Sequence, residues 1–276
     1  MNTFTRTWRL MRNALGVLKK DTELLVFPVL STIAAGLVMV SFAIPLLGDG
    51  VRPLLARAGA HDPVLYVWGF LFYFANYFVV IFFNAAIVAC ALARMTGDDP
   101  TVRFGLRTAW RRLGPIVLWA LATSTVGFAL RVIEERVGMV GRIVVAVLGM
   151  TWSVTSFLVV PVLVHKGKGP IDAYTDSIAM LKRSWGEQIV GNVSFGLLFV
   201  VLGFVPVGLV VAVATTGSTI ALGTAIAISG IYLLLLVLAQ ATLQAIYQAA
   251  VYCYAYTGSA PEGFDERALA DSFRQR

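Results

Sequence analysis

Six long apolar runs take up most of the chain and limit what it can fold into. Because a helix of about 20 apolar residues crosses the hydrocarbon core of a bilayer, each run is long enough for one crossing. The second and sixth runs exceed that length, so we expect these helices to tilt, bend or extend beyond the headgroups. The sequence therefore predicts an all-α polytopic fold with six transmembrane helices, at residues 24–47, 64–93, 115–133, 143–165, 188–213 and 220–255.

The composition favours a membrane protein over a soluble one. Of the 276 residues, 58% are hydrophobic and 13% are charged, whereas about 25% of the residues of a soluble domain are charged. Both cysteines, Cys90 and Cys253, lie inside apolar runs, which argues against a disulfide framework. The first run is too long for the core of a signal peptide, so we interpret it as a retained span. We expect a single domain over residues 1–276.

Three of the runs are followed by the same short pattern, a glycine and then, three residues later, a proline. Glycine adopts the left-handed conformation that ends a helix, and proline is pre-set for a first helical turn. The pattern predicts three repeated hairpins, at residues 24–93, 115–165 and 188–255, each followed by a surface helix, at 100–113, 170–185 and 261–276. The structural residues of these exits are Gly97, Pro100, Gly167, Pro170, Gly258 and Pro261.

The basic residues are distributed as in a membrane protein, although the net charge of +7 taken alone would also fit a nucleic-acid-binding protein. Seventeen of the 22 Lys and Arg residues lie in the N-terminal segment, the second and fourth connections and the C-terminus, and five lie in the other connections. By the positive-inside rule, both termini are expected in the cytoplasm. We expect anionic lipid headgroups rather than nucleic acid as partners.

The segments on the basic side have the pattern of amphipathic helices. Residues 1–20 contain one, and in residues 100–113 arginines recur every four positions beside an apolar stripe of Phe104, Trp110 and Leu113. We expect these helices to lie in the membrane interface and to touch anionic lipid. The predicted membrane-surface residues are Trp8, Arg103, Arg107, Trp110, Arg111 and Trp185.

The first 30 residues resemble a known family. The surface-helix sequence Thr7-Trp8-Arg9-Leu10, followed by Lys20-Asp21-Thr22-Glu23-Leu24-Leu25-Val26-Phe27-Pro28 at the entry to the first span, is similar to an uncharacterised prokaryotic family of six-span membrane proteins, a domain of unknown function. The Gly-x-x-Pro hairpins also resemble the membrane domains attached to some glycerophosphodiesterases. The first resemblance implies a six-span fold and a multi-pass location in a prokaryotic cytoplasmic membrane, but no activity. The second carries no hydrolase chemistry, because the chain contains no phosphodiesterase domain.

A stripe of amides is the clearest polar feature inside the spans. Gln240, Gln244 and Gln248 recur every four residues and therefore share one helix face. Such amides either tie helices together or line a hydrated path, and we favour the structural role. If the repeats are equivalent, a seam between spans 2, 4 and 6 would also include the polar residues Asn76, Asn84, Thr151 and Thr155.

No pattern in the sequence predicts catalysis, a metal site or a cofactor. Arg131 and Glu135 are one helical turn apart at the outer end of the third span, which favours an interfacial ion pair over a proton or ion site. His61 and His165 have no Cys or His at ligand spacing. Nucleophile motifs and phosphate-binding or dinucleotide-binding loops are absent. We therefore expect a protein that is not an enzyme and that has no cofactor.

Two functions remain open on this evidence. The first is a membrane scaffold whose cytoplasmic amphipathic helices bind anionic lipid, a protein partner or a second copy of the chain. The second is a transporter or lipid-handling channel that uses the amide-lined seam. A threefold repeat argues against the second function, because alternating access normally uses two related halves.

Overall fold

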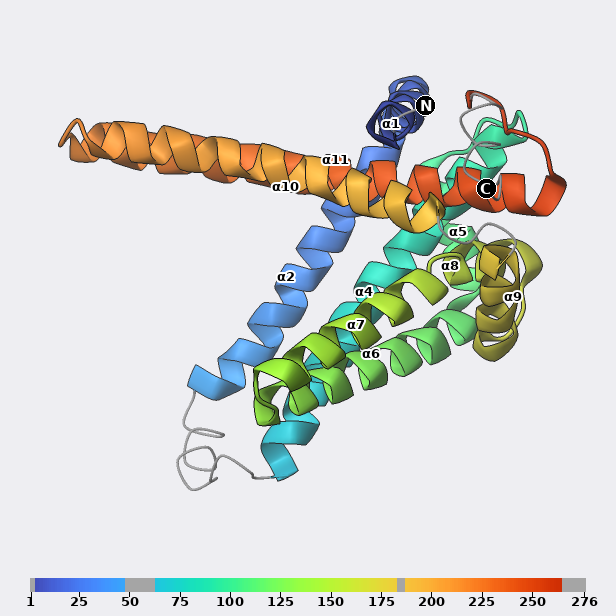
Figure 1. Cartoon of the computed structure of the whole chain (residues 1–276), viewed down its shortest axis with the longest axis horizontal. Coiled ribbons are helices and arrows are strands. Elements are labelled where there is room, and N and C mark those ends of the chain that lie inside the picture. The colour runs from blue at the N-terminus through green and yellow to red at the C-terminus, as the bar shows by residue number, and fades with distance from the viewer. Residues whose placement is uncertain (1–2, 48–62, 183–186, 265–276) are drawn as a thin grey trace. The chain divides into compact units, whose positions relative to one another are not determined.

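The computed structural model describes residues 3–47, 63–182 and 187–264, and every regular element among them is a helix (Figure 1). The N-terminal part holds α1 (Thr3–Lys20), the short 3₁₀ helix η1 (Thr22–Leu25), α2 (Val26–Leu47) and α4 (Pro63–Met95). The middle holds α5 (Val102–Arg111), α6 (Leu113–Arg136), α7 (Met139–Thr155) and α8 (Val159–Lys166). The chain continues through α9 (Pro170–Lys182), α10 (Glu187–Ala214) and α11 (Thr219–Thr257).

Five helical stretches among the described residues are long and apolar enough to cross a membrane: Thr22–Pro45, Pro63–Met95, Leu113–Arg136, Met139–Lys166 and Thr219–Thr257. This confirms the all-helical character of the fold. The fifth predicted run coincides with α10, in which Leu198–Ala214 forms a shorter apolar segment. The expectation of six spans therefore stays a prediction, with five supported by length and composition.

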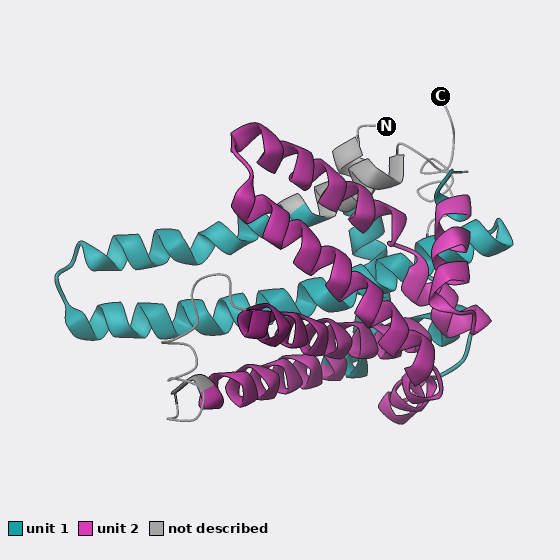
Figure 2. Cartoon of the chain, turned by 90° about the horizontal axis from the view of Figure 1, so that it is seen from below, with its two compact units in different colours: residues 1–25, 91–99, 180–276 teal, residues 26–90, 100–179 magenta. Residues whose placement is uncertain are grey.

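Contacts within the chain divide it into two compact units (Figure 2). The first unit contains residues 1–25, 91–99 and 180–276, and the second contains residues 26–90 and 100–179. Neither unit is a continuous stretch of sequence, and α4 contributes to both. The sequence predicts one domain and gives no sign of this division.

In the first unit, α10 and α11 form a long antiparallel hairpin, against which α1 packs (Figures 1 and 2). The turn between them uses Gly217 with a φ of +70°, and the Ser218 side chain accepts a hydrogen bond from the Ala221 N–H at the start of α11. The apolar side of α1 is buried at Leu10, Ala14 and Val17, and the C-terminal half of α11 is buried almost continuously from Ala245 to Tyr252.

In the second unit, glycines allow close contacts between helices. A Cβ atom on Gly127 of α6 would lie 3.0 Å from the Tyr77 hydroxyl of α4, and one on Gly69 of α4 would lie 3.4 Å from the Phe128 ring of α6. Gly105 of α5 is crowded by two helices at once. A Cβ atom there would lie 2.7 Å from Cys90 Sγ, 2.7 Å from Phe27 Cζ and 2.8 Å from the Ala86 carbonyl oxygen. Glycine at 105 therefore lets α5 pack on α2 and α4.

The three predicted exit glycines each lie at the end of a helix. Gly97, Gly167 and Gly258 have φ values of +93°, +65° and +77°, and they follow α4, α8 and α11 respectively. Pro170 is the first residue of α9, whereas Pro100 precedes Thr101, the N-cap of α5. Pro261 begins a turn in which the Phe264 N–H donates to the Pro261 carbonyl at 3.1 Å. The rest of the predicted 261–276 helix lies outside the described residues, and the threefold repeat stays a prediction.

The fourth predicted span is two helices, because the chain leaves the helical path between α7 and α8. The Ser177 hydroxyl of α9 bridges the break, donating to the Thr155 carbonyl at 2.7 Å and accepting from the Leu158 N–H at 3.2 Å. Directly before Ser177 on α9, Asp176 accepts hydrogen bonds from the ammonium groups of Lys168 and Lys166, both at 2.9 Å. These bonds lower the pKa of Asp176 below its ordinary value. The α8–α9 turn is thereby fixed by both polar and ionic contacts.

We expect Gly105→Ala to destabilise the protein by about 1–3 kcal/mol, because the added methyl group collides with a backbone carbonyl that cannot rotate away. Thermal unfolding of the detergent-solubilised chain measures the effect. Gly114→Ala is the matched control, since its Cβ atom would meet nothing within 4 Å. A Gly105→Ala protein with the wild-type Tm would contradict the packing at this contact.

Candidate functional site

The arginines predicted to face a membrane surface lie together on the exposed side of α5. Arg103, Arg107 and Arg111 are all exposed, while Gly105 and Ala109 on the opposite side are buried. Two aromatic residues border the arginines, Trp110 with 67% of its surface exposed and Phe104 with 44%. The helix therefore presents three guanidinium groups between two aromatic side chains, a combination suited to a membrane interface.

Local contacts fix the orientation of α5. The Thr101 side chain accepts a hydrogen bond from the Phe104 N–H at the helix start, and the Thr101 carbonyl accepts one from Cys90 Sγ at 3.6 Å. The Trp110 ring meets Phe82 of α4 edge to face, with the ring centroids 6.4 Å apart. Apolar packing thus holds one side of α5, and the arginines on the other side are free of it.

Two further tryptophans, Trp8 and Trp185, are predicted to face the membrane surface, and the structure describes only the first of them. Trp8 lies on α1 and is half exposed. It precedes the buried face formed by Leu10 and Ala14, so α1 has an apolar packed side and a basic outer side with Arg9 and Arg12. Trp185 lies outside the described residues.

The three glutamines of the predicted stripe lie on α11 with different exposures. Gln244 is exposed, Gln240 is half-buried, and Gln248 is 7% exposed within the buried C-terminal half of the helix. They belong to the first unit, whereas the other predicted seam residues, Asn76, Asn84, Thr151 and Thr155, belong to the second. The seam between spans 2, 4 and 6 therefore stays a prediction.

Most of the seam residues in the second unit bond to their own helix. Asn76 donates to the Phe72 carbonyl at 2.9 Å, and Thr151 donates to the Val147 carbonyl at 2.8 Å. Thr155 donates to the Thr151 carbonyl at 2.8 Å and lies 3.0 Å from the Tyr174 hydroxyl of α9. Tyr174 stacks on Trp152, which stacks on Trp119. Thr155 thus belongs to a packed cluster at the α7–α8 break.

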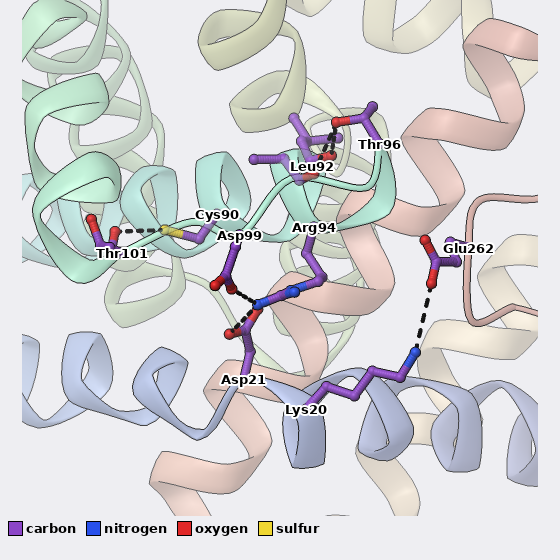
Figure 3. Close-up of polar contacts among 10 residues, drawn as sticks. Lys20, Asp21, Cys90, Leu92, Arg94, Thr96, Asp99, Thr101 and Glu262 are labelled. Carbon is purple, nitrogen blue, oxygen red and sulfur yellow. Dashed lines mark hydrogen bonds and ion pairs between the residues drawn. The ribbon is translucent and has the colours of Figure 1, made fainter.

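An ion-pair cluster that the sequence did not predict joins the end of α1 to the end of α4 (Figure 3). Arg94, in the last turn of α4, donates two hydrogen bonds to the Asp21 carboxylate, at 2.5 and 2.7 Å, and a third to Asp99. Asp21 is only 7% exposed. When one partner of a bidentate, largely buried pair of this kind is lost, the folded protein is destabilised by about 3–5 kcal/mol, because the other charge stays buried without a partner. The only sequence signal was the Lys20-Asp21 pair within the family resemblance.

A cavity of about 270 Å³ opens among α4, α6 and α7 within the second unit. The small glycine and alanine residues on its lining make room for the cavity. Its polar wall consists of two tyrosines and the ionisable residues of α6. Arg131 donates to Glu135 at 3.1 Å, with both side chains exposed, which is the ion pair expected from their spacing. The lining residues are Tyr73, Tyr77, Gly127, Leu130, Arg131, Glu134, Val145, Ala146 and Gly149.

Among the residues that the structure describes, no three His, Cys, Asp or Glu side chains are grouped as metal ligands. Cys90 is buried in the contact between α4 and α5, and Cys253 is partly buried on α11. Neither cysteine is in a disulfide. The described residues thus offer surfaces and cavities for binding.

Comparison with known proteins identifies a family but no function. Residues 64–263 match DUF6159, described as a family of unknown function, and no curated protein and no solved structure gives a significant match. The matched range contains all three glycine exits and excludes α1 and α2, where the residues of the sequence resemblance lie. The expectation of an uncharacterised family is confirmed, while its prokaryotic origin and six spans stay predictions. Because the match covers more than half of the chain, the protein belongs to DUF6159, a family of unknown function.

Proposed function

We propose that the protein is a non-enzymatic, multi-pass scaffold of a prokaryotic cytoplasmic membrane, with both termini in the cytoplasm. Its basic helices lie at the inner leaflet and bind anionic lipid headgroups there. The same surface can accept a protein partner or a second copy of the chain. The observation that carries this proposal is the exposed face of α5, with Arg103, Arg107 and Arg111 between Trp110 and Phe104.

The energetics favour an anionic surface over a neutral one. Each basic residue near an anionic leaflet contributes about 1 kcal/mol to the free energy of binding. The three arginines together therefore contribute more than one exposed ion pair within the protein would. Tryptophan prefers the headgroup level of a bilayer, because its ring is apolar while its N–H still finds a hydrogen-bond acceptor. Gly105 supports the proposal as well, since it holds the opposite side of α5 close to α2 and α4.

A peptide of residues 100–113 is expected to bind vesicles that contain phosphatidylglycerol and to lose affinity as salt rises, because the attraction acts through a screened field. Trp110 is the only tryptophan in this stretch, so a blue shift of its fluorescence measures the binding. The control peptide replaces Arg103, Arg107 and Arg111 with glutamine, and its affinity should fall by at least about a hundredfold. If the wild-type peptide bound neutral vesicles as tightly as anionic ones at every salt concentration, the electrostatic part would be contradicted.

Topology is tested separately by cysteine labelling in intact cells. In a background with Cys90 and Cys253 replaced by serine, Asp98→Cys and Ser259→Cys should be protected from a membrane-impermeant thiol reagent applied outside, because the basic-rich connections are cytoplasmic. Ala58→Cys, in the predicted outer connection, should react and serves as the positive control. Reaction of the Asp98 or Ser259 variants in unbroken cells would rule out the proposed orientation.

A transporter or lipid-handling channel is the second candidate, and the cavity among α4, α6 and α7 favours it. A conduit would have to connect to the amide stripe of α11. Cysteines at Gln240, Gln244 and Gln248 would then all react with a water-soluble thiol reagent, whereas Leu235→Cys, an exposed apolar position, would not. The scaffold predicts little reaction at the three positions, and uniform labelling along the stripe would favour the channel instead.

A further inference from the structure

A second cavity, of about 240 Å³, lies within the first unit. Its walls come from α1, from the last turn of α4 and from the turn that follows α11, with Gly16 and Gly263 leaving room on two sides. One water occupies about 30 Å³ of liquid volume, so the space holds several waters or one phosphate group. It is smaller than the 300–1,000 Å³ typical of sites for drug-sized ligands. Its occupant is therefore a small group rather than a whole lipid.

Hydrogen-bond donors outnumber acceptors on the cavity wall. Arg12 contributes a guanidinium group, Lys20 an ammonium group and Asn13 an amide, whereas Glu262 is the one carboxylate on the lining. Among the described residues, no acidic side chain pairs with Arg12. Lys20 and Glu262 are 3.6 Å apart with both side chains 64% exposed, a pair that contributes little. The α1 helix that supplies three of these residues contains no acid, so the wall favours an anion.

The amide of Asn13 is the sharpest sign of a ligand. Its Nδ2 atom is buried and has no hydrogen-bond partner, although buried N–H groups in folded proteins are nearly always paired. Asn13 lines the same cavity as the two cations of α1. An anionic oxygen in the cavity would accept from this donor and from both cations together.

The walls are held in place by contacts outside the cavity. Arg94 is fixed by Asp21 and Asp99, so the end of α4 is anchored to the end of α1 (Figure 3). The turn after α11 uses Gly263 with a φ of +87° and is closed by a hydrogen bond from the Phe264 N–H to the Pro261 carbonyl. The Phe264 side chain is buried. A wall that is already ordered loses little conformational entropy when a ligand binds.

We propose that this cavity binds a single phosphate group, with Arg12 and Lys20 supplying charge and Asn13 donating to a phosphate oxygen. The assignment rests on the proposed function, in which α1 and the end of α4 lie at the inner leaflet. The phosphate belongs either to the monoester headgroup of a membrane lipid or to a soluble phosphate. Both sources share the chemistry that the wall recognises, and the experiment separates them.

The test uses the purified full chain in a neutral maltoside detergent, titrated calorimetrically with inorganic phosphate and with dioctanoyl phosphatidic acid. Dioctanoyl phosphatidylcholine, whose phosphate is a diester capped by a cation, is the ligand control. We expect saturable one-to-one binding that Arg12→Gln, Lys20→Gln and Asn13→Asp each weaken about tenfold or more. Arg103→Gln, on α5 in the other unit, should leave this binding unchanged while weakening the attachment to anionic vesicles.

Tighter binding of phosphatidic acid than of inorganic phosphate would support a lipid headgroup as the ligand, and equal or weaker binding would support a soluble phosphate. The proposal is overturned if neither probe binds at millimolar concentration. It is overturned equally if the Arg12, Lys20 and Asn13 variants, with wild-type Tm in the absence of ligand, bind as well as wild type. Either result would leave the vesicle binding of α5 untouched, so failure of the cavity and failure of the scaffold are distinguishable.

Discussion

The need to satisfy the backbone of an apolar chain governs where each helix of this protein can stop. In hydrocarbon an unpaired N–H or C=O costs several kcal/mol, so a chain can leave the helical path only where other groups replace the lost bonds. Left-handed glycines meet this need at Gly97, Gly167 and Gly258. At the α7–α8 break a side chain does so, because the Ser177 hydroxyl pairs with both the Thr155 carbonyl and the Leu158 N–H. Docking of α9 is therefore a condition for the bent path of this span.

The ends of helices are also where the ionic contacts gather. Asp21 follows α1, Arg94 ends α4, and their bidentate pair joins segments that are 73 residues apart in sequence. Lys166, Lys168 and Asp176 join α8 to α9 in the same way. Because these clusters lie at helix ends, none of their charges falls in the middle of an apolar run, where a charge would carry a large penalty. In each unit, polar contacts thus fix the ends of apolar helices.

The sequence predicts the apolar helices well, because their signal is local. Runs of apolar residues correspond to α2, α4, α6 and α11, and glycine follows the helices that it was expected to end. The split of residues 143–165 into α7 and α8 escaped prediction, because it depends on Ser177, 22 residues away from Thr155. The contact of Thr155 with Tyr174 of α9 is equally hidden in the sequence, since four-residue spacing identifies a helix face but not its neighbour. The buried, unpaired Nδ2 atom of Asn13 cannot be predicted from the sequence, because the burial of a single atom depends on tertiary packing.

The family match and the sequence resemblance involve different parts of the chain. The residues that carry the sequence resemblance lie at 7–28, whereas DUF6159 matches residues 64–263. The part of the chain that the family shares therefore begins with α4 and leaves out α1. The α5 face lies within the shared part, and most of the phosphate cavity wall lies outside it on α1.

The basic residues show why net charge alone says little about function. Arg94 is bound by two carboxylates and acts as a structural tie, and Arg112 lies against Gly167 at the end of α8, where its guanidinium occupies the space that a side chain would need. Arg103, Arg107 and Arg111 have the opposite character, since they are exposed beside a helix face that is already packed. Arg12 faces a cavity with an unpaired donor beside it. An arginine already bound by carboxylates has little left to offer a ligand. Among the described residues, affinity for an anion therefore depends on cations such as Arg12, which no carboxylate holds in place.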